Sequence, residues 1–105
     1  MELVIDTNIV FAAMVKNSVS RHLLLNSNLI LYSPEGLISE LEEHKEEIRR
    51  KSGLREEKNN ELMAILLSKI KLVSKESIAP FLKKALEFSP DVDDSPFLAL
   101  CLAKG

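Results

Sequence analysis

Short apolar runs alternate along the chain with longer segments of helical periodicity. Residues 3–5, 29–32 and 72–73 are apolar and are followed by polar or turn-forming residues, which predicts three buried strands. The spacing of apolar positions and the Pro, Gly and Ser punctuation predict helices over 9–15, from Ser18 or Ser20 to 26, and over 34–52, 56–70, 80–88 and 95–104. Strands that alternate with helices predict an α/β domain whose parallel sheet is covered on both faces.

The last predicted helix has an apolar face and is followed by Gly105, where the sequence ends. The α/β pattern calls for a further strand at this point, and a parallel sheet of three strands is small. We therefore expect residues 1–105 to form one domain that lacks its C-terminal strand segment.

Composition limits the class of protein. The 105 residues are 46% hydrophobic and 29% charged, which is typical of one globular domain and excludes disordered and fibrous classes. The net charge of -2 argues against a coat protein that binds nucleic acid through bulk positive charge. The single cysteine excludes an intrachain disulfide or a multi-thiolate zinc site. The longest apolar runs are far shorter than the roughly 20 residues of a membrane span, so we expect a soluble, cytoplasmic protein with no membrane partner.

Acidic residues occupy three positions that suit chemistry at one edge of the sheet. Asp6 follows the first predicted strand, where ligands of open α/β sheets bind, although an Asp there is more often a helix N-cap. Glu40 lies on the flank of the apolar stripe of its helix, although a solvated glutamate would also fit. Asp94 precedes the last helix in a loop with Asp91 and Asp93, and a single cap does not require three acids. Carboxylates that converge from such positions are suitable ligands for Mg²⁺ or Mn²⁺.

Three segments together resemble a PIN domain, the fold of many metal-dependent ribonucleases. They are MELVIDTNIV, ISELEEH and SPDVDDSPFLALCLAKG, and the similarity is greatest to the PIN toxins of toxin–antitoxin pairs and their archaeal relatives. The resemblance implies a three-layer α/β/α fold with a parallel sheet and a metal site of Asp6, Glu40 and Asp94. It implies supporting roles for Thr7 and Asn8, and assistance from Asp91 and Asp93. It also implies an RNA substrate, single-stranded or structured, an antitoxin that covers the acidic site, and a homodimer. In the strand order that the resemblance implies, residues 3–5 lie between the second strand and the missing one. Their open edge has no Pro, Lys or bulge signal, so we expect two copies of this chain to associate through it.

The densest basic cluster lies near the end of the long predicted helix. Its members are Arg49, Arg50, Lys51 and, beyond Gly53, Arg55. Ion pairs with Glu46 and Glu47 and the helix dipole explain these cations without a ligand. The alternative, which the resemblance suggests, is that this corner contacts RNA phosphates.

The reaction that we expect is metal-dependent hydrolysis of an RNA phosphodiester bond, with Mg²⁺ or Mn²⁺ held by the three acids. An alternative of another class is a PIN-derived module that binds RNA or protein without catalysis. A phosphoacceptor receiver domain is a weaker alternative, because Thr7 and Asn8 follow Asp6 where such domains pair their acids.

Overall fold

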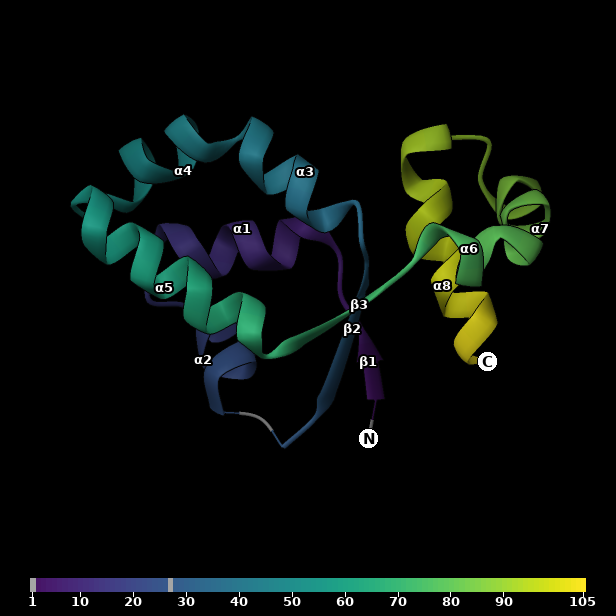
Figure 1. Cartoon of the computed structure of the whole chain (residues 1–105), viewed down its shortest axis with the longest axis horizontal. Coiled ribbons are helices and arrows are strands. Elements are labelled where there is room, and N and C mark those ends of the chain that lie inside the picture. The colour runs from purple at the N-terminus through teal and green to yellow at the C-terminus, as the bar shows by residue number, and fades with distance from the viewer. Residues whose placement is uncertain (1, 27) are drawn as a thin grey trace.

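The computed structural model describes residues 2–26 and 28–105, without the side chains of Asn26 and Asp93. Three parallel strands form one sheet with helices on both faces (Figure 1). The elements are β1 (Glu2–Val4), α1 (Thr7–Val15), α2 (Val19–Asn26), β2 (Ile30–Pro34), α3 (Leu37–Glu43), α4 (Lys45–Ser52), α5 (Glu56–Ser68), β3 (Ile70–Val73), α6 (Lys75–Ile78), η1 (Ala79–Phe81), α7 (Leu82–Phe88), η2 (Val92–Asp94) and α8 (Ser95–Lys104). This arrangement confirms the predicted α/β fold.

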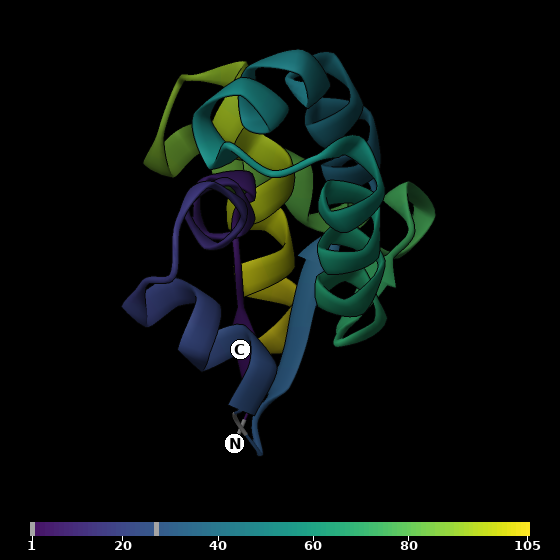
Figure 2. The same ribbon diagram turned by 90° about the vertical axis from the view of Figure 1, so that its left-hand side faces the viewer.

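The strand order is β1-β2-β3, so β2 is central and β1 is an outer strand. Leu3 pairs with Leu31, and Leu31 pairs with Ile70, so the three strands share one direction and end at the same edge. Figure 2 shows β1 and β2 side by side. The ladder continues beyond β1, because the Ile5 N–H donates to the Tyr32 carbonyl at 2.8 Å.

Two apolar cores lie on opposite faces of the sheet. Helices α1 to α5 cover one face and α6 to α8 cover the other (Figure 1). Leu31 of β2 belongs to the first core, whereas its neighbour Tyr32 packs against the second. This alternation is the period of two that a strand covered on both faces requires. The second core brings α8 back across β2 and β1 after the chain has left β3.

The predicted helix over 34–52 is wrong in two respects. Pro34 is the last residue of β2, where it pairs with Val73, and the helix begins only at Leu37. His44 then separates α3 from α4 with non-helical angles of φ -101° and ψ 13°. This bend turns α4 over α1, against which it packs, and a straight helix would have continued in the direction of α3.

Smaller differences concern the ends of elements. The first strand is Glu2–Val4 and the third is Ile70–Val73, so residue 70 belongs to a strand rather than to the preceding helix. Helix α6 was not predicted from the sequence. Its signal is Ser74, whose Oγ accepts a hydrogen bond from the Ser77 N–H at 3.3 Å and caps the helix.

Candidate active site

Asp6 follows β1 and is the N-cap of α1. Its backbone is extended (φ -99°, ψ 174°), and its Oδ1 accepts a hydrogen bond from the Ile9 N–H at 3.2 Å. This bond satisfies one of the free N–H groups in the first turn of the helix. A carboxylate has two oxygens with about four acceptor positions, so capping fixes Asp6 and still leaves it capacity to bind a ligand.

Glu40 of α3 is connected to the start of α1. The hydroxyl of Thr7 donates a hydrogen bond to Glu40 Oε2 at 2.5 Å. A hydrogen bond to a carboxylate is charge-assisted and roughly twice as strong as one between neutral groups. Thr7 therefore holds Glu40 at the start of α1, next to Asp6 in the chain. This bond is a physical basis for the supporting role predicted for Thr7.

Asp94 is the residue before α8, but its side chain does not cap the helix. The turn is closed by other groups: the Asp94 N–H donates to the Asp91 carbonyl at 3.2 Å, and the Ser95 hydroxyl donates to the Val92 carbonyl at 2.8 Å. Pro96 occupies the first turn of α8, where its missing N–H costs nothing. The exposed Asp94 carboxylate is thus left out of the capping of its own helix.

The three acids line one cleft of about 150 Å³. The residues that line it come from the ends of β1 and β2 and from the starts of α1, α3 and α8. Figure 1 shows these element ends at the upper edge of the sheet. The acids line the same cleft because parallel strands end at one edge of the sheet and because α8 packs against β2 and β1. Besides the acids, the lining consists of Thr7, Asn8, Ser33, Pro34, Gly36, Leu37, Pro96 and Phe97.

The other acids predicted for the site are placed differently. Asp91 is exposed and is not among the described residues that line the cleft. The side chain of Asp93 lies outside the described part of the structure, so its role stays a prediction. Asn8, predicted as a supporting residue, does line the cleft.

The donor chemistry of the cleft fits a hard divalent cation, whereas the packing of the acids is loose. As the described side chains lie, no group of three Asp, Glu, His or Cys is placed to hold one metal ion. Mg²⁺, however, usually binds through one or two carboxylates and keeps several waters, so it does not require three acids in direct contact. The lining offers carboxylate, hydroxyl and amide oxygens, which are the ligands that such ions select.

A family model described as PIN domain matches residues 4–105. The chain belongs to the PIN domain family. No curated protein and no solved structure matches it significantly. PIN domains are generally nucleases that use divalent metals, and the matched range contains all three acids of the cleft. In this PIN domain, no helix of the described residues is long and apolar enough to cross a bilayer.

Sequence reasoning missed one polar residue of the cleft, Ser33. It is 1% exposed and stands at the end of β2, two residues after Leu31 and on the same face of the strand. A hydroxyl at the last inward position of an apolar strand was the available signal, since that position normally carries an aliphatic side chain.

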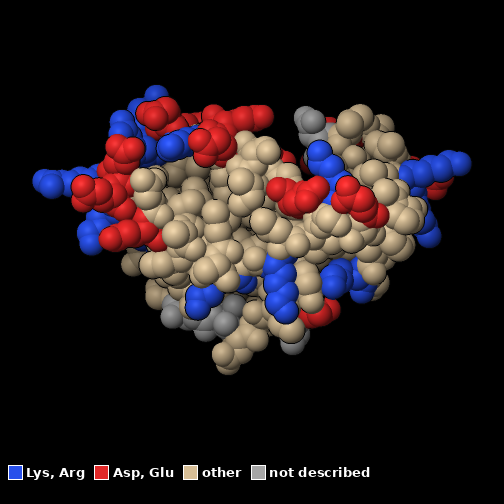
Figure 3. All heavy atoms as spheres, viewed as in Figure 1, with Lys and Arg blue, Asp and Glu red and all other residues tan. Residues whose placement is uncertain are grey.

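The basic cluster of α4 is largely paired within the protein. Arg49 contacts Glu46 at 3.6 Å and Glu56 at 3.9 Å, and Lys51 contacts Glu47 at 2.9 Å. Figure 3 shows charges of both signs interleaved over α4 and α5 rather than a continuous basic patch. These pairs favour the interpretation of a solvated helix end.

Two of the predicted RNA-contacting cations are not explained by these pairs. Arg50 and Arg55 are exposed, and neither belongs to an ion pair among the described residues. The predicted contact with RNA therefore depends mainly on these two arginines. Both flank the turn between α4 and α5, so they belong to one corner of the molecule.

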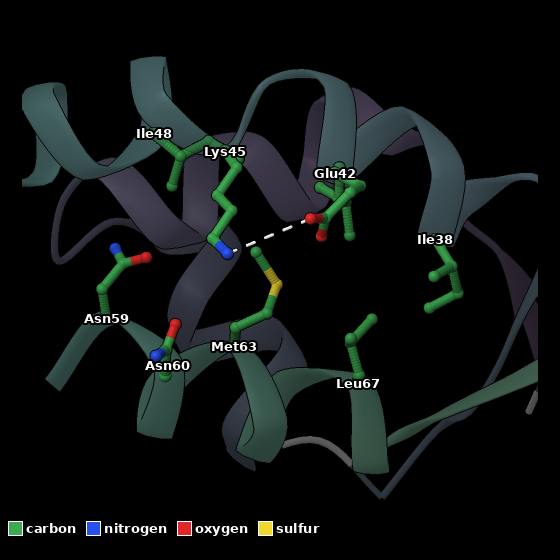
Figure 4. Close-up of a pocket in the computed structure, with 9 residues that line it drawn as sticks. Ile38, Glu42, Lys45, Ile48, Asn59, Asn60, Met63 and Leu67 are labelled. Carbon is green, nitrogen blue, oxygen red and sulfur yellow. Dashed lines mark ion pairs between the residues drawn. The ribbon is translucent and has the colours of Figure 1, made fainter. Parts of the chain in front are cut away.

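A second hollow, of about 140 Å³, lies away from the acids between α3, α4 and α5. Figure 4 shows its mostly apolar walls, with Met63 and Leu67 on α5 and an ion pair between Lys45 Nζ and Glu42 Oε1, 3.9 Å apart. Asn59 at one end is 6% exposed and donates from Nδ2 to Ser52 Oγ at 3.2 Å. This hollow lacks the converging acids of the cleft, so we assign the chemistry to the cleft.

Proposed function

We propose that this PIN domain is a metal-dependent endoribonuclease in which Asp6, Glu40 and Asp94 hold one or two Mg²⁺ or Mn²⁺ ions. The observation that carries the proposal is that carboxylates from three separate elements line one cleft at the carboxyl ends of the strands. Such an ion, when bound, lowers the pKa of a coordinated water and neutralises charge on the phosphate.

The residues of the chain supply position and charge. Asp6 is held by the cap of α1, and Glu40 is held by the Thr7 hydroxyl, so both carboxylates belong to fixed elements. Asp94 completes the set from the other helical layer. A phosphodiester carries a negative charge that these acids repel, which makes cation binding a condition for binding RNA in the cleft.

The test is cleavage of a single-stranded RNA by the purified chain with added Mn²⁺ or Mg²⁺. We expect cleavage that EDTA abolishes and that Asp6→Asn reduces at least a hundredfold. Asparagine caps a helix about as well as aspartate, so this variant should keep its fold and melting temperature. Glu43→Gln, a charge-neutralising change on an exposed glutamate of α3 outside the cleft, is the matched control and should cleave normally.

Equal cleavage by Asp6→Asn and the unaltered chain would refute the proposed site. RNA binding without cleavage, in the presence of either ion, would favour the second candidate, a PIN-derived binding module. The observation that favours a binding module is that no three described acids are placed to hold one ion. The two functions therefore differ in a single measurement on the same sample.

A narrower proposal is that the chain is the toxin of a toxin–antitoxin pair. It is supported by the resemblance of the segments MELVIDTNIV, ISELEEH and SPDVDDSPFLALCLAKG to PIN toxins. It predicts that a small protein encoded next to this one binds the domain and protects the cleft. The measurement is co-purification of the two proteins and loss of ribonuclease activity in the complex. A neighbouring protein that neither binds nor inhibits would refute the toxin assignment and leave the nuclease proposal intact.

We also propose that the chain forms a homodimer, with a second copy as its partner. Its support is that β1 pairs with β2 alone among the described strands, so the backbone on its outer side is open to another strand. Because the Ile5 N–H points to β2, the N–H and C=O of Val4 point outward. Light scattering should give twice the monomer mass, and N-methylation or proline at position 4 should reduce it. A monomer at high concentration would refute this interface.

A further inference from the structure

Ser33 is a buried polar group without a partner in the described structure. Its side chain is 1% exposed, yet its hydroxyl makes no hydrogen bond to any described residue. Leaving a hydroxyl buried and unbonded normally costs stability, so buried hydroxyls are nearly always paired. Ser33 therefore requires an explanation.

The other two buried polar residues in the described part of the chain show that this is not a general feature of the fold. Ser95 is 5% exposed and donates to the Val92 carbonyl at 2.8 Å, and Asn59 is 6% exposed and donates to Ser52 at 3.2 Å. Both of these bonds close local turns. Ser33 differs from them because it lines the cleft of the three acids.

Ser33 lies where the apolar core meets the cleft: it lines the cleft with the three acids and is not a member of either core cluster. It follows Leu31 on the face of β2 that α1 to α5 cover, and the parallel register places it beside Ile5, the residue before Asp6. An alanine or valine would fill the same inward position without an unbonded hydroxyl. A hydroxyl at this position thus points to a partner that occupies the cleft.

We propose that Ser33 is a positioning residue that accepts a hydrogen bond from a water in the hydration shell of the cation in the cleft. This inference rests on the proposed function. In the described structure the Ser33 hydroxyl bonds to none of the carboxylate, hydroxyl and amide groups that line the cleft, so we infer that its partner is brought by the ligand. A hydrated divalent cation brings strongly polarised water donors, and Mg²⁺ or Mn²⁺ keeps several waters when carboxylates bind it. Groups of this kind orient a metal site without contacting the ion.

The experiment measures Mn²⁺ affinity by electron paramagnetic resonance titration, together with the melting temperature of the metal-free protein. Ser33→Ala should weaken Mn²⁺ binding about 10- to 100-fold, the range typical of residues that support metal ligands. Its metal-free melting temperature should stay the same or rise, because no hydrogen bond is lost. Ser33→Thr, which keeps the hydroxyl on a residue suited to strands, should retain most of the affinity.

Asn59→Leu is the control. It removes a bonded buried amide that does not line the cleft, so we expect a melting temperature lower by about 4–8 °C and unchanged Mn²⁺ affinity. If Ser33→Ala behaves like this control, its hydroxyl has a structural partner, such as a fixed water, and the inference is overturned.

The other outcomes separate the two proposals. Wild-type Mn²⁺ affinity in Ser33→Ala, with weakened binding in Asp6→Asn, would overturn the role of Ser33 and leave the metal site standing. Absence of Mn²⁺ binding by the unaltered chain at millimolar concentration would overturn both.

Discussion

The hydrogen bond from Thr7 to Glu40 joins two elements of the cleft, and its removal gives the sharpest test of how the site is built. Thr7→Val keeps the β-branched shape and has nearly the same helix propensity, but it removes the hydroxyl. The bond is short, at 2.5 Å, and its acceptor is a carboxylate, which favours a large contribution. Glu40 is exposed and Thr7 is only half-buried, so water competes for both groups and reduces the contribution of the bond to stability.

We therefore expect Thr7→Val to lower the free energy of unfolding by about 1 kcal/mol, the typical net value of a hydrogen bond. For a domain of this size the change corresponds to a melting temperature lower by roughly 4–8 °C. Release of Glu40 should also weaken Mn²⁺ binding by about tenfold, the lower end of the range for residues that support metal ligands. Thr7→Ser keeps the hydroxyl and should restore most of both quantities.

Urea unfolding of a double-mutant cycle with Glu40→Ala isolates the interaction from other effects of each change. A coupling free energy near 1 kcal/mol would support the bond as the connection between α1 and α3. A coupling of zero, with Mn²⁺ affinity unchanged in Thr7→Val, would refute the argument that Thr7 positions Glu40.

Three further measurements test the surrounding structure. Asn59→Leu keeps the branching of a buried side chain but removes its hydrogen bond to Ser52, so the free energy of unfolding from urea titration should fall by about 1 kcal/mol. The pKa of Glu47 lies below its ordinary value because Lys51 donates a hydrogen bond to it and places a positive charge beside it, so the resulting stabilisation is present above the ordinary glutamate pKa and is lost as the pH falls through the lowered one. Lys51→Gln should return that pKa toward the ordinary value in a nuclear magnetic resonance titration, and an unchanged titration would contradict the assignment. Burial raises the pKa of the Cys101 thiol, so its alkylation at pH 8 should be slower in the folded chain than in urea, and equal rates would show that the thiol is freely accessible.

The elements that were predictable from the sequence are those whose signals are local. The apolar runs predicted three strands, and Gly53 predicted the end of a helix, where it adopts a φ of 69° that other residues rarely take. The bend at His44 has no such signal, because residues 37, 41 and 48 keep helical spacing on both sides of it. The bend depends on packing of α4 over α1, which is a tertiary effect.

In the candidate site, too, local signals were predictable from the sequence and contacts between distant segments were not. Asp6, Glu40 and Asp94 could be proposed from their positions at element ends and from the resemblance to PIN domains, and the structure places all three on one cleft. The Thr7–Glu40 bond could not be derived, because it joins residues far apart in sequence through a geometry that only the fold determines. Ser33 was missed because burial without a partner is visible only when every neighbour is known.

The two interpretations of Asp6, a helix cap and a metal ligand, turn out to be compatible. The cap uses Oδ1 and orients the carboxylate along the start of α1, which also brings the positive end of the helix dipole to the cleft. A ligand fixed in this way loses little side-chain entropy when a cation binds. Glu40, at the end of the first turn of α3, is held by the hydrogen bond from the Thr7 hydroxyl. The Asp94 side chain, in contrast, makes no capping hydrogen bond. The proposed metal site requires these acids to close around a cation, because no three of the described acids are placed to hold one ion as they stand.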